Sequence, residues 1–174
     1  MPLGTAFAIA LATFLVTTNV RWATNSSDLW EALFDRNQVI KRTGIEKEEL
    51  RRGARQIQDY FRSDVEPLDV VINSGGMKVS FFDQREVAHM ADVKRLFQGT
   101  FLIHTVVGSI LGSIAVVGLG IFRRRFFRPL AWMSIAGGGL TILFVGLIGI
   151  VALINFSAAF TSFHVISFSN DLWQ

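Results

Sequence analysis

Charge is distributed very unevenly along this chain of 174 residues, and this distribution constrains the fold more than any other feature. Three stretches contain no Asp, Glu, Lys or Arg at all: residues 2–20, 98–122 and 129–170. A helix needs about 20 apolar residues to cross the hydrocarbon core of a bilayer, and each stretch approaches or exceeds that length. The overall hydrophobic share of 51% would be ordinary in a soluble protein, so the segregation decides the class. The sequence therefore predicts an α-helical integral membrane protein.

The arginine cluster between the last two apolar stretches predicts the orientation. Residues 123–128 carry four Arg and no acid, and short basic loops stay cytoplasmic. The N-terminus is then cytoplasmic as well. The predicted order is a first membrane helix at 4–20, an extracytoplasmic domain at 21–97, a second membrane helix at 98–122, a cytoplasmic arginine loop at 123–129, a third membrane helix at 130–154 and an outer interfacial aromatic segment at 155–174. A cleaved signal peptide is the competing interpretation of the first block, but no basic residues precede it.

The polar insertion at 21–97 is predicted to form a small α+β domain. Its 13 basic and 13 acidic residues cancel, so the net charge of +3 comes from the four clustered arginines less Asp171. This origin of the basic pI argues against a nucleic-acid partner. Because the insertion is too small to form a large core of its own, we expect it to pack against the membrane surface or against its own membrane helices.

Local patterns predict the elements of this domain. A helix is expected from Asp28 to Arg42. Thr43 and Glu46 have the spacing of a capping box that opens a second helix. In that helix one face is apolar at i, i+4, i+7 and i+11, formed by Leu50, Ala54, Ile57 and Phe61. A strand at 68–72, a turn at 73–76 and a strand at 77–82 follow. A second capping box, Asp83 to Glu86, begins a helix that runs towards the second membrane helix.

Several kinds of chemistry are excluded by missing residues. The chain has no cysteine, which removes disulfides, thiolate metal sites and cysteine nucleophiles. Phosphate-binding loops, dinucleotide motifs and the nucleophile elbow of hydrolases are also missing. We expect no nucleotide chemistry.

His89 is the first candidate catalytic residue. It lies on the helix that leads into the second membrane helix, and its face carries Val93 and Leu96. Glu86 and Asp92 stand three residues away on either side, each within reach of the ring. An imidazole with carboxylates in reach suits a general base, while the alternative is a structural histidine at a helix contact. Glu and His at this spacing also occur in di-iron bundles, but the membrane helices supply no further ligands, so we expect no metal.

Two further histidines occur. His104 lies inside the second membrane helix on one face with Gly108 and Gly112, which favours helix packing, although an ionisable residue at membrane depth often has a function. His164 follows the third membrane helix in an aromatic segment typical of the outer membrane interface, where its ring would reach a lipid ester; the alternative is an interfacial aromatic belt without a catalytic role. A b-type cytochrome with His104 and His164 as axial ligands is an alternative hypothesis.

Two of these segments together resemble the bacterial lipoprotein intramolecular transacylase family. The first is Glu86-x-x-His89-Met90-x-Asp92-Val93, and the second is Phe163-His164-x-Ile-x-Phe168-x-Asn170-Asp171-x-Trp173. The helix opening Gly44-Ile45-x-x-Glu48-Glu49-Leu50 is also similar to the extracytoplasmic domain of that family. The resemblance covers nearly the whole chain.

The resemblance implies an enzyme of the bacterial plasma membrane. Its reaction moves the sn-2 acyl chain of a diacylglyceryl lipoprotein to the α-amine of the N-terminal cysteine, giving a lyso-form lipoprotein, without metal or other cofactor. His89 and His164 match the two histidines of the family as catalytic residues, and Glu86, Asp92, Asn170 and Asp171 are the expected supporting residues. Family members resemble four-helix membrane proteins, so three predicted membrane helices indicate a fragment or a shortened member. The alternative from another functional class is a non-catalytic membrane protein whose outer domain binds a partner.

Overall fold

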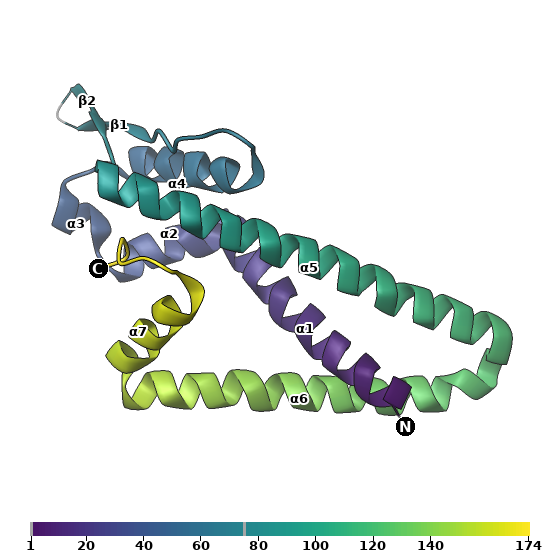
Figure 1. Cartoon of the computed structure of the whole chain (residues 1–174). Helices are drawn as coiled ribbons and strands as arrows, with labels where there is room; N and C mark the ends of the chain where they lie inside the picture. The colour runs from purple at the N-terminus through teal and green to yellow at the C-terminus, as the bar shows by residue number, and fades with distance from the viewer. Residues whose placement is uncertain (1, 75) are drawn as a thin grey trace. The chain divides into compact units, whose positions relative to one another are not determined.

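The computed structural model describes residues 2–74 and 76–174, and most of them are helical (Figure 1). The elements in chain order are α1 (Pro2–Asn25), α2 (Ser27–Arg36), α3 (Val39–Thr43), α4 (Lys47–Arg62), β1 (Val71–Ser74), β2 (Met77–Ser80), α5 (Gln84–Phe122), the 3-10 helix η1 (Arg123–Phe126), α6 (Phe127–Ile154) and α7 (Phe156–Ser167). The chain divides into two compact units, each described by itself below. The apolar unit holds the chain up to Arg21 and Gly99–Ser167, and the polar unit holds Trp22–Gln98 and Phe168–Gln174.

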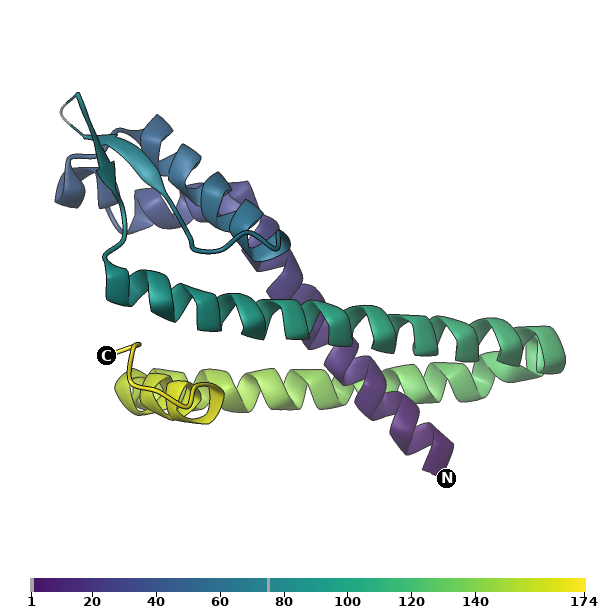
Figure 2. The ribbon, with the colours of Figure 1, turned by 45° about the horizontal axis from the view of Figure 1, so that its top comes forward.

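The apolar unit contains most of the two helical stretches that are long and apolar enough to cross a membrane. Among the described residues these are Leu3–Asn25 and Gln84–Ile154, the second of which joins α5, η1 and α6. Most large apolar side chains of α6 are exposed, as expected of a helix that faces lipid. The short helix α7 follows α6 after Asn155, contacts it and leaves its end at an angle (Figure 1), and Figure 2 shows both helices from another side.

Small residues set the contacts of α1 within this unit. A Cβ atom built on Gly137 of α6 would lie 2.9 Å from Leu11 and 3.0 Å from the carbonyl oxygen of Ala8. A Cβ atom on Gly108 of α5 would lie 2.7 Å from the ring of Phe14. Since neither position has room for a side chain, the two glycines let α5 and α6 approach α1 closely, as small residues do in membrane bundles.

The core of the polar unit is built on α4. Leu50, Ala54, Ile57 and Phe61 are all buried, which confirms the predicted apolar face. This face packs against β1, where Ile72 is 3% exposed, and against Val70 just before it, which is 1% exposed. The strands pair antiparallel, with Ile72 opposite Val79.

Three local predictions for this unit need correction. The expected helix from Asp28 to Arg42 is broken after Arg36, because Gln38 adopts a left-handed conformation with φ of 52°. The capping box at Thr43 and Glu46 does not form. The Thr43 hydroxyl donates to the Val39 carbonyl instead, and the side chain of Glu46 makes no cap. The first strand is shifted to 71–74 from the expected 68–72, the second begins at residue 77 as expected but ends at Ser80, and residue 75 of the predicted turn lies outside the described residues.

The second capping box is confirmed at the start of α5. The Asp83 carboxylate accepts from the backbone N–H of Glu86 at 2.8 Å, and the Glu86 carboxylate accepts from the backbone N–H of Asp83 at 2.9 Å. The helix thus begins at a defined residue, which fixes the directions in which the side chains of its first turns project.

A buried lysine holds the first part of α5 against the rest of the polar unit. Lys94 is 3% exposed, donates to the carbonyl oxygen of Val65 at 2.6 Å and lies 3.3 Å from the Glu66 carboxylate. Its ammonium also lies 4.2 Å from the centre of the Tyr60 ring. Burial, followed by the hydrogen bond to Glu66, raises the pKa of Tyr60. Lys94 projects about 140° around the helix from His89. The His89 face of α5 therefore points away from the contacts that Lys94 makes with Val65 and Glu66.

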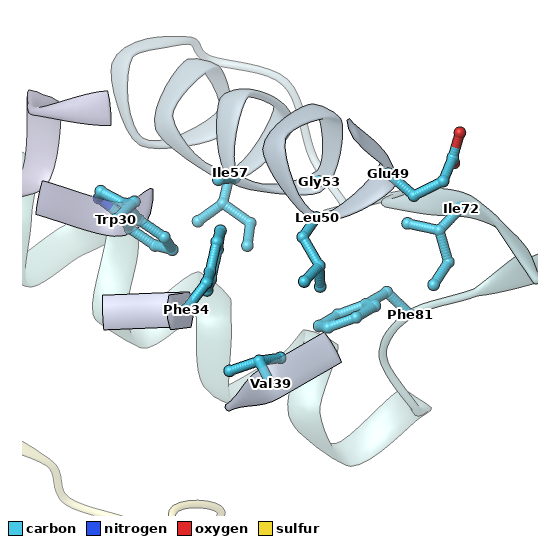
Figure 3. A pocket seen from close by; sticks show the side chains of 10 residues that line it. Trp30, Phe34, Val39, Glu49, Leu50, Gly53, Ile57, Ile72 and Phe81 are labelled. Atoms are coloured by element: carbon cyan, nitrogen blue, oxygen red, sulfur yellow. The ribbon is translucent and has the colours of Figure 1, made fainter. Parts of the chain in front are cut away.

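A small cavity lies in the core between α4, the hairpin and the helices before them (Figure 3). Its volume is about 90 Å³, and its lining is apolar apart from Glu49, whose carboxylate accepts from the backbone N–H of Asn73 at 2.8 Å. That volume equals roughly three waters at their share of the liquid. A long acyl chain does not fit in this cavity.

Candidate functional site

The first turns of α5 carry one face of candidate residues within the polar unit. His89 is half-buried, and its ring meets Phe168 edge to face, with centroids 5.0 Å apart and planes at 72°. Asp92, three residues further, accepts a hydrogen bond of 2.7 Å from the Asn170 amide. Residues 168–174, which we name the strap, therefore cover the His89 face of the helix.

The Asp92 carboxylate is held in its ionised form. The amide donor of Asn170 is the main cause of its lowered pKa, and a hydrogen bond from Arg95 and the nearby His89 add to the effect against partial burial. An ionised carboxylate beside an imidazole stabilises the protonated ring, which suits a histidine that must take up a proton.

Asn170 is the residue that shapes the strap. Its side-chain oxygen accepts from the backbone N–H of Leu172 at 3.1 Å, and its carbonyl oxygen accepts from the indole of Trp173 at 3.0 Å. Asp171 acts through its backbone, since its carbonyl oxygen accepts from Arg85 at 2.7 Å. Of the two supporting residues expected here, Asn170 thus contributes a side chain and Asp171 a carbonyl group.

Glu86 has a structural position. Its carboxylate closes the capping box at the start of α5, so Asp92 is the carboxylate tied to the strap on the His89 face.

His164 lies on α7, in the apolar unit. Its Nδ1 atom is 2.8 Å from the carbonyl oxygen of Phe160, and the rings of these two residues lie 4.0 Å apart. A carbonyl oxygen can only accept, so the contact selects the tautomer protonated on Nδ1, in which Nε2 carries the lone pair. His89 and His164 belong to different units, and their convergence on one substrate remains a prediction.

His104 makes contacts typical of helix packing. Its Nδ1 atom lies 3.3 Å from the hydroxyl of Thr17, and its ring stacks on Phe14 with centroids 4.5 Å apart. The Thr17 hydroxyl lies 2.8 Å from the carbonyl oxygen of Thr13, to which it donates, which leaves its oxygen to accept from His104. These contacts favour the packing interpretation of this residue.

Sequence reasoning missed Arg85. It stands four residues before His89, a spacing that places two side chains on neighbouring turns of one helix face, so the periodicity already contained the signal. Among the residues that the structure describes, no group of three or more His, Asp or Glu side chains is arranged to hold a metal ion.

Comparison with known proteins gives one consistent result. A family model described as lipoprotein intramolecular transacylase Lit matches residues 5–174. An in meso structure of the membrane-integral lipoprotein intramolecular transacylase Lit from Bacillus cereus matches with a TM-score of 0.74 and 20% identity, covering 98% of this chain and 73% of that chain.

Two variants of the same Bacillus cereus protein are also similar. A structure with a histidine-to-arginine substitution has a TM-score of 0.66 at 20% identity, covering 99% of this chain and 70% of that one. A structure with a histidine-to-alanine substitution has a TM-score of 0.65 at 21% identity, covering 99% and 71%. At these identities the likeness shows a shared fold. A sequence search of curated proteins finds no match.

Proposed function

This chain belongs to the lipoprotein intramolecular transacylase Lit family, and we propose that it moves the sn-2 acyl chain of a diacylglyceryl lipoprotein to the α-amine of the N-terminal cysteine. One observation supports this proposal above all others. The two segments that carry the sequence resemblance meet in the polar unit, where Asn170 bonds Asp92 and Phe168 contacts His89. Segments almost 80 residues apart in the chain thus build one surface around an imidazole.

The proposed chemistry needs only groups of this kind. The amine nitrogen attacks the ester carbonyl carbon, and the carbonyl π electrons move onto oxygen. A base takes the proton of the nitrogen, the bond to the glycerol oxygen breaks, and an acid protonates that oxygen. In this scheme His89 and His164 share the base and acid roles, with the charge of Asp92 supporting a protonated His89. Because both reacting groups belong to one molecule, the site only has to fold the substrate into a reactive shape.

We further propose that the reaction takes place at the outer face of a bacterial plasma membrane. In this arrangement 4–20, 98–122 and 130–154 cross the bilayer, 21–97 forms an extracytoplasmic α+β domain, and the N-terminus is cytoplasmic. The exposed aromatic side chains of α7, Phe156, Phe160 and Phe163, suit the headgroup level at which a diacylglyceryl ester lies.

Conversion of a diacylglyceryl peptide by the purified full chain in liposomes tests this function. Substrate and product are isomers of equal mass, so tandem mass spectrometry must locate the acyl group on the cysteine nitrogen. The expected result is N-acylation by the wild type and its loss in a folded His89→Ala variant. A folded wild type that leaves the amine unmodified would contradict the proposed function.

A further inference from the structure

Arg85 shares a helix face with the two candidate residues that follow it. At about 100° per residue, Arg85, His89 and Asp92 of α5 project within about 60° of one another. Neighbours at i and i+4 have Cβ atoms about 5–6 Å apart. Long helical side chains also lean towards the helix N-terminus, which brings the His89 ring over the turn that carries Arg85.

The strap touches each of these three residues in turn. Phe168 meets the His89 ring, Asn170 bonds the Asp92 carboxylate, and the carbonyl oxygen of Asp171 receives the bond from Arg85. This last contact anchors the guanidinium at the border of the face that His89 occupies. Its position is therefore set by two segments, the helix and the strap.

Most of the hydrogen-bonding capacity of Arg85 is unused within the polar unit. A guanidinium has five N–H donors, and one nitrogen bonds Asp171. Among the residues that the structure describes, Arg85 makes no other hydrogen bond and no ion pair with a carboxylate, and its side chain is exposed. Arg51, Arg52 and Arg55 of the same unit pair with glutamates, whereas Arg85 keeps open donors on the helix face that also carries His89.

Acyl transfer requires such donors. When the amine attacks the ester, the carbonyl oxygen gains a full negative charge, and preorganised N–H donors that meet this charge lower the barrier. We propose that Arg85 is a further catalytic residue, whose guanidinium donates to this oxyanion while His89 handles the proton. The guanidinium of arginine holds several N–H donors in one plane, which suits a developing oxyanion better than the compact charge of a lysine ammonium. This inference rests on the proposed transacylase function.

Steady-state kinetics of Arg85 variants test the assignment in full-length protein in liposomes, with a diacylglyceryl peptide as substrate. Arg85→Gln should lower kcat about 10²–10³-fold, the usual effect of removing an oxyanion donor, with KM almost unchanged. Arg85→Lys should recover only part of the rate. Its ammonium can still reach the Asp171 carbonyl but lacks the planar set of N–H donors of a guanidinium.

A docking readout separates this role from that of a residue that only holds the strap. The chain contains no cysteine, so a single cysteine introduced at Leu172 reports strap docking through its rate of maleimide labelling. The expected result is that Arg85→Lys, whose ammonium can still reach the Asp171 carbonyl, is labelled at the wild-type rate while its kcat stays well below that of the wild type.

Three results would overturn the inference. Arg85→Gln could retain the wild-type kcat, Arg85→Lys could restore it fully, or the loss of kcat across the Arg85 variants could follow their rate of maleimide labelling. The last two results would mean that Arg85 only holds the strap against α5 and takes no part in the reaction. If the folded wild type fails to convert the peptide, the proposed function itself fails and this inference falls with it, so the two failures are distinguishable.

Discussion

Asp92 joins the two segments that form the candidate site. Its carboxylate accepts hydrogen bonds from Asn170 of the strap and from Arg95 on its own helix, and both hold its pKa below the ordinary value of 3.8. Because the pKa is lowered on folding, the interaction stabilises the folded state above the unfolded pKa. This stabilisation is lost as the pH falls through the lowered pKa of the folded state.

We therefore predict that Asn170→Leu raises the pKa of Asp92. The amide is the main cause of the lowered value, so its removal should bring the carboxyl back towards 3.8 and weaken the acid dependence of strap docking, since the strap then no longer bonds this carboxylate. The measurement is a ¹³C NMR titration of the Asp92 carboxyl in micelles, with Leu172→Ala as a strap control. An unchanged pKa in Asn170→Leu would show that Arg95 alone sets it.

The two candidate catalytic histidines should act as one unit. If His89 and His164 meet the same ester, each single alanine substitution should remove most acyl transfer, since general acid–base groups contribute about 10²–10⁴-fold. Interdependent roles are not additive, so the double variant should be little worse than either single variant.

The control for this prediction is His104→Ala, which should keep appreciable activity because His104 packs on Phe14 and Thr17. Conversion of a diacylglyceryl peptide is measured for all four variants and the wild type. Near-normal conversion by folded His89→Ala or His164→Ala would refute the shared site, and loss confined to His104→Ala would move it into the membrane helices.

At the residue scale, the sequence reached the candidates by two routes. Helical periodicity placed Asp92 next to His89, while Asn170 and Asp171 entered only through the resemblance to a family. No pattern within the sequence reveals a bond between residues 78 apart, because tertiary packing creates it. The use of the Asp171 backbone in place of its side chain is equally invisible to sequence reasoning.

At the scale of single elements, uncharged apolar runs predicted the long helices well. Length and composition are enough for such helices, because a backbone in lipid has to satisfy its own hydrogen bonds. The break between α2 and α3 was not predicted, since residues 36–39 contain neither glycine nor proline. The predicted capping box fails for a physical reason. Thr43 is the last residue of α3, and Gly44 after it ends that helix with φ of 71°, so Thr43 cannot also begin α4.

Gly108 and Gly112 of α5 provide a matched pair for testing helix packing. A Cβ atom on Gly108 would lie 2.7 Å from the ring of Phe14, whereas one on Gly112 meets nothing within 4 Å. Gly108→Ala should therefore displace Phe14 and destabilise the apolar unit by about 1–3 kcal/mol, the typical cost of overpacking. Gly112→Ala should be neutral or slightly stabilising, because alanine is the better helix former.

Unfolding of both glycine variants in mixed micelles by a denaturing detergent measures this difference. Equal stability of the two variants would contradict the close contact between α1 and α5.

At the scale of the whole molecule, charge segregation along the chain is the organising feature. All basic excess lies in residues 123–128, while 21–97 has no net charge. Translocating four arginines is unfavourable, so we predict that the arginine cluster stays cytoplasmic and sets the orientation of the helices connected to it. The long apolar helices followed from this pattern, but the arrangement of the two histidines did not, because it depends on tertiary contacts.

Topology reporters test the orientation directly. A reporter fused at residue 126 should be cytoplasmic, and reporters fused at residues 60 and 174 should be extracytoplasmic, because the arginine cluster stays inside. Replacing the four clustered arginines with glutamine serves as the control, since it removes the charge asymmetry and should give mixed orientations. A cytoplasmic reporter at residue 60 in the otherwise unchanged chain would place His89 on the wrong side of the membrane for an extracytoplasmic lipoprotein. The assignment of His89, Arg85 and Asp92 to acyl transfer would then fail with it.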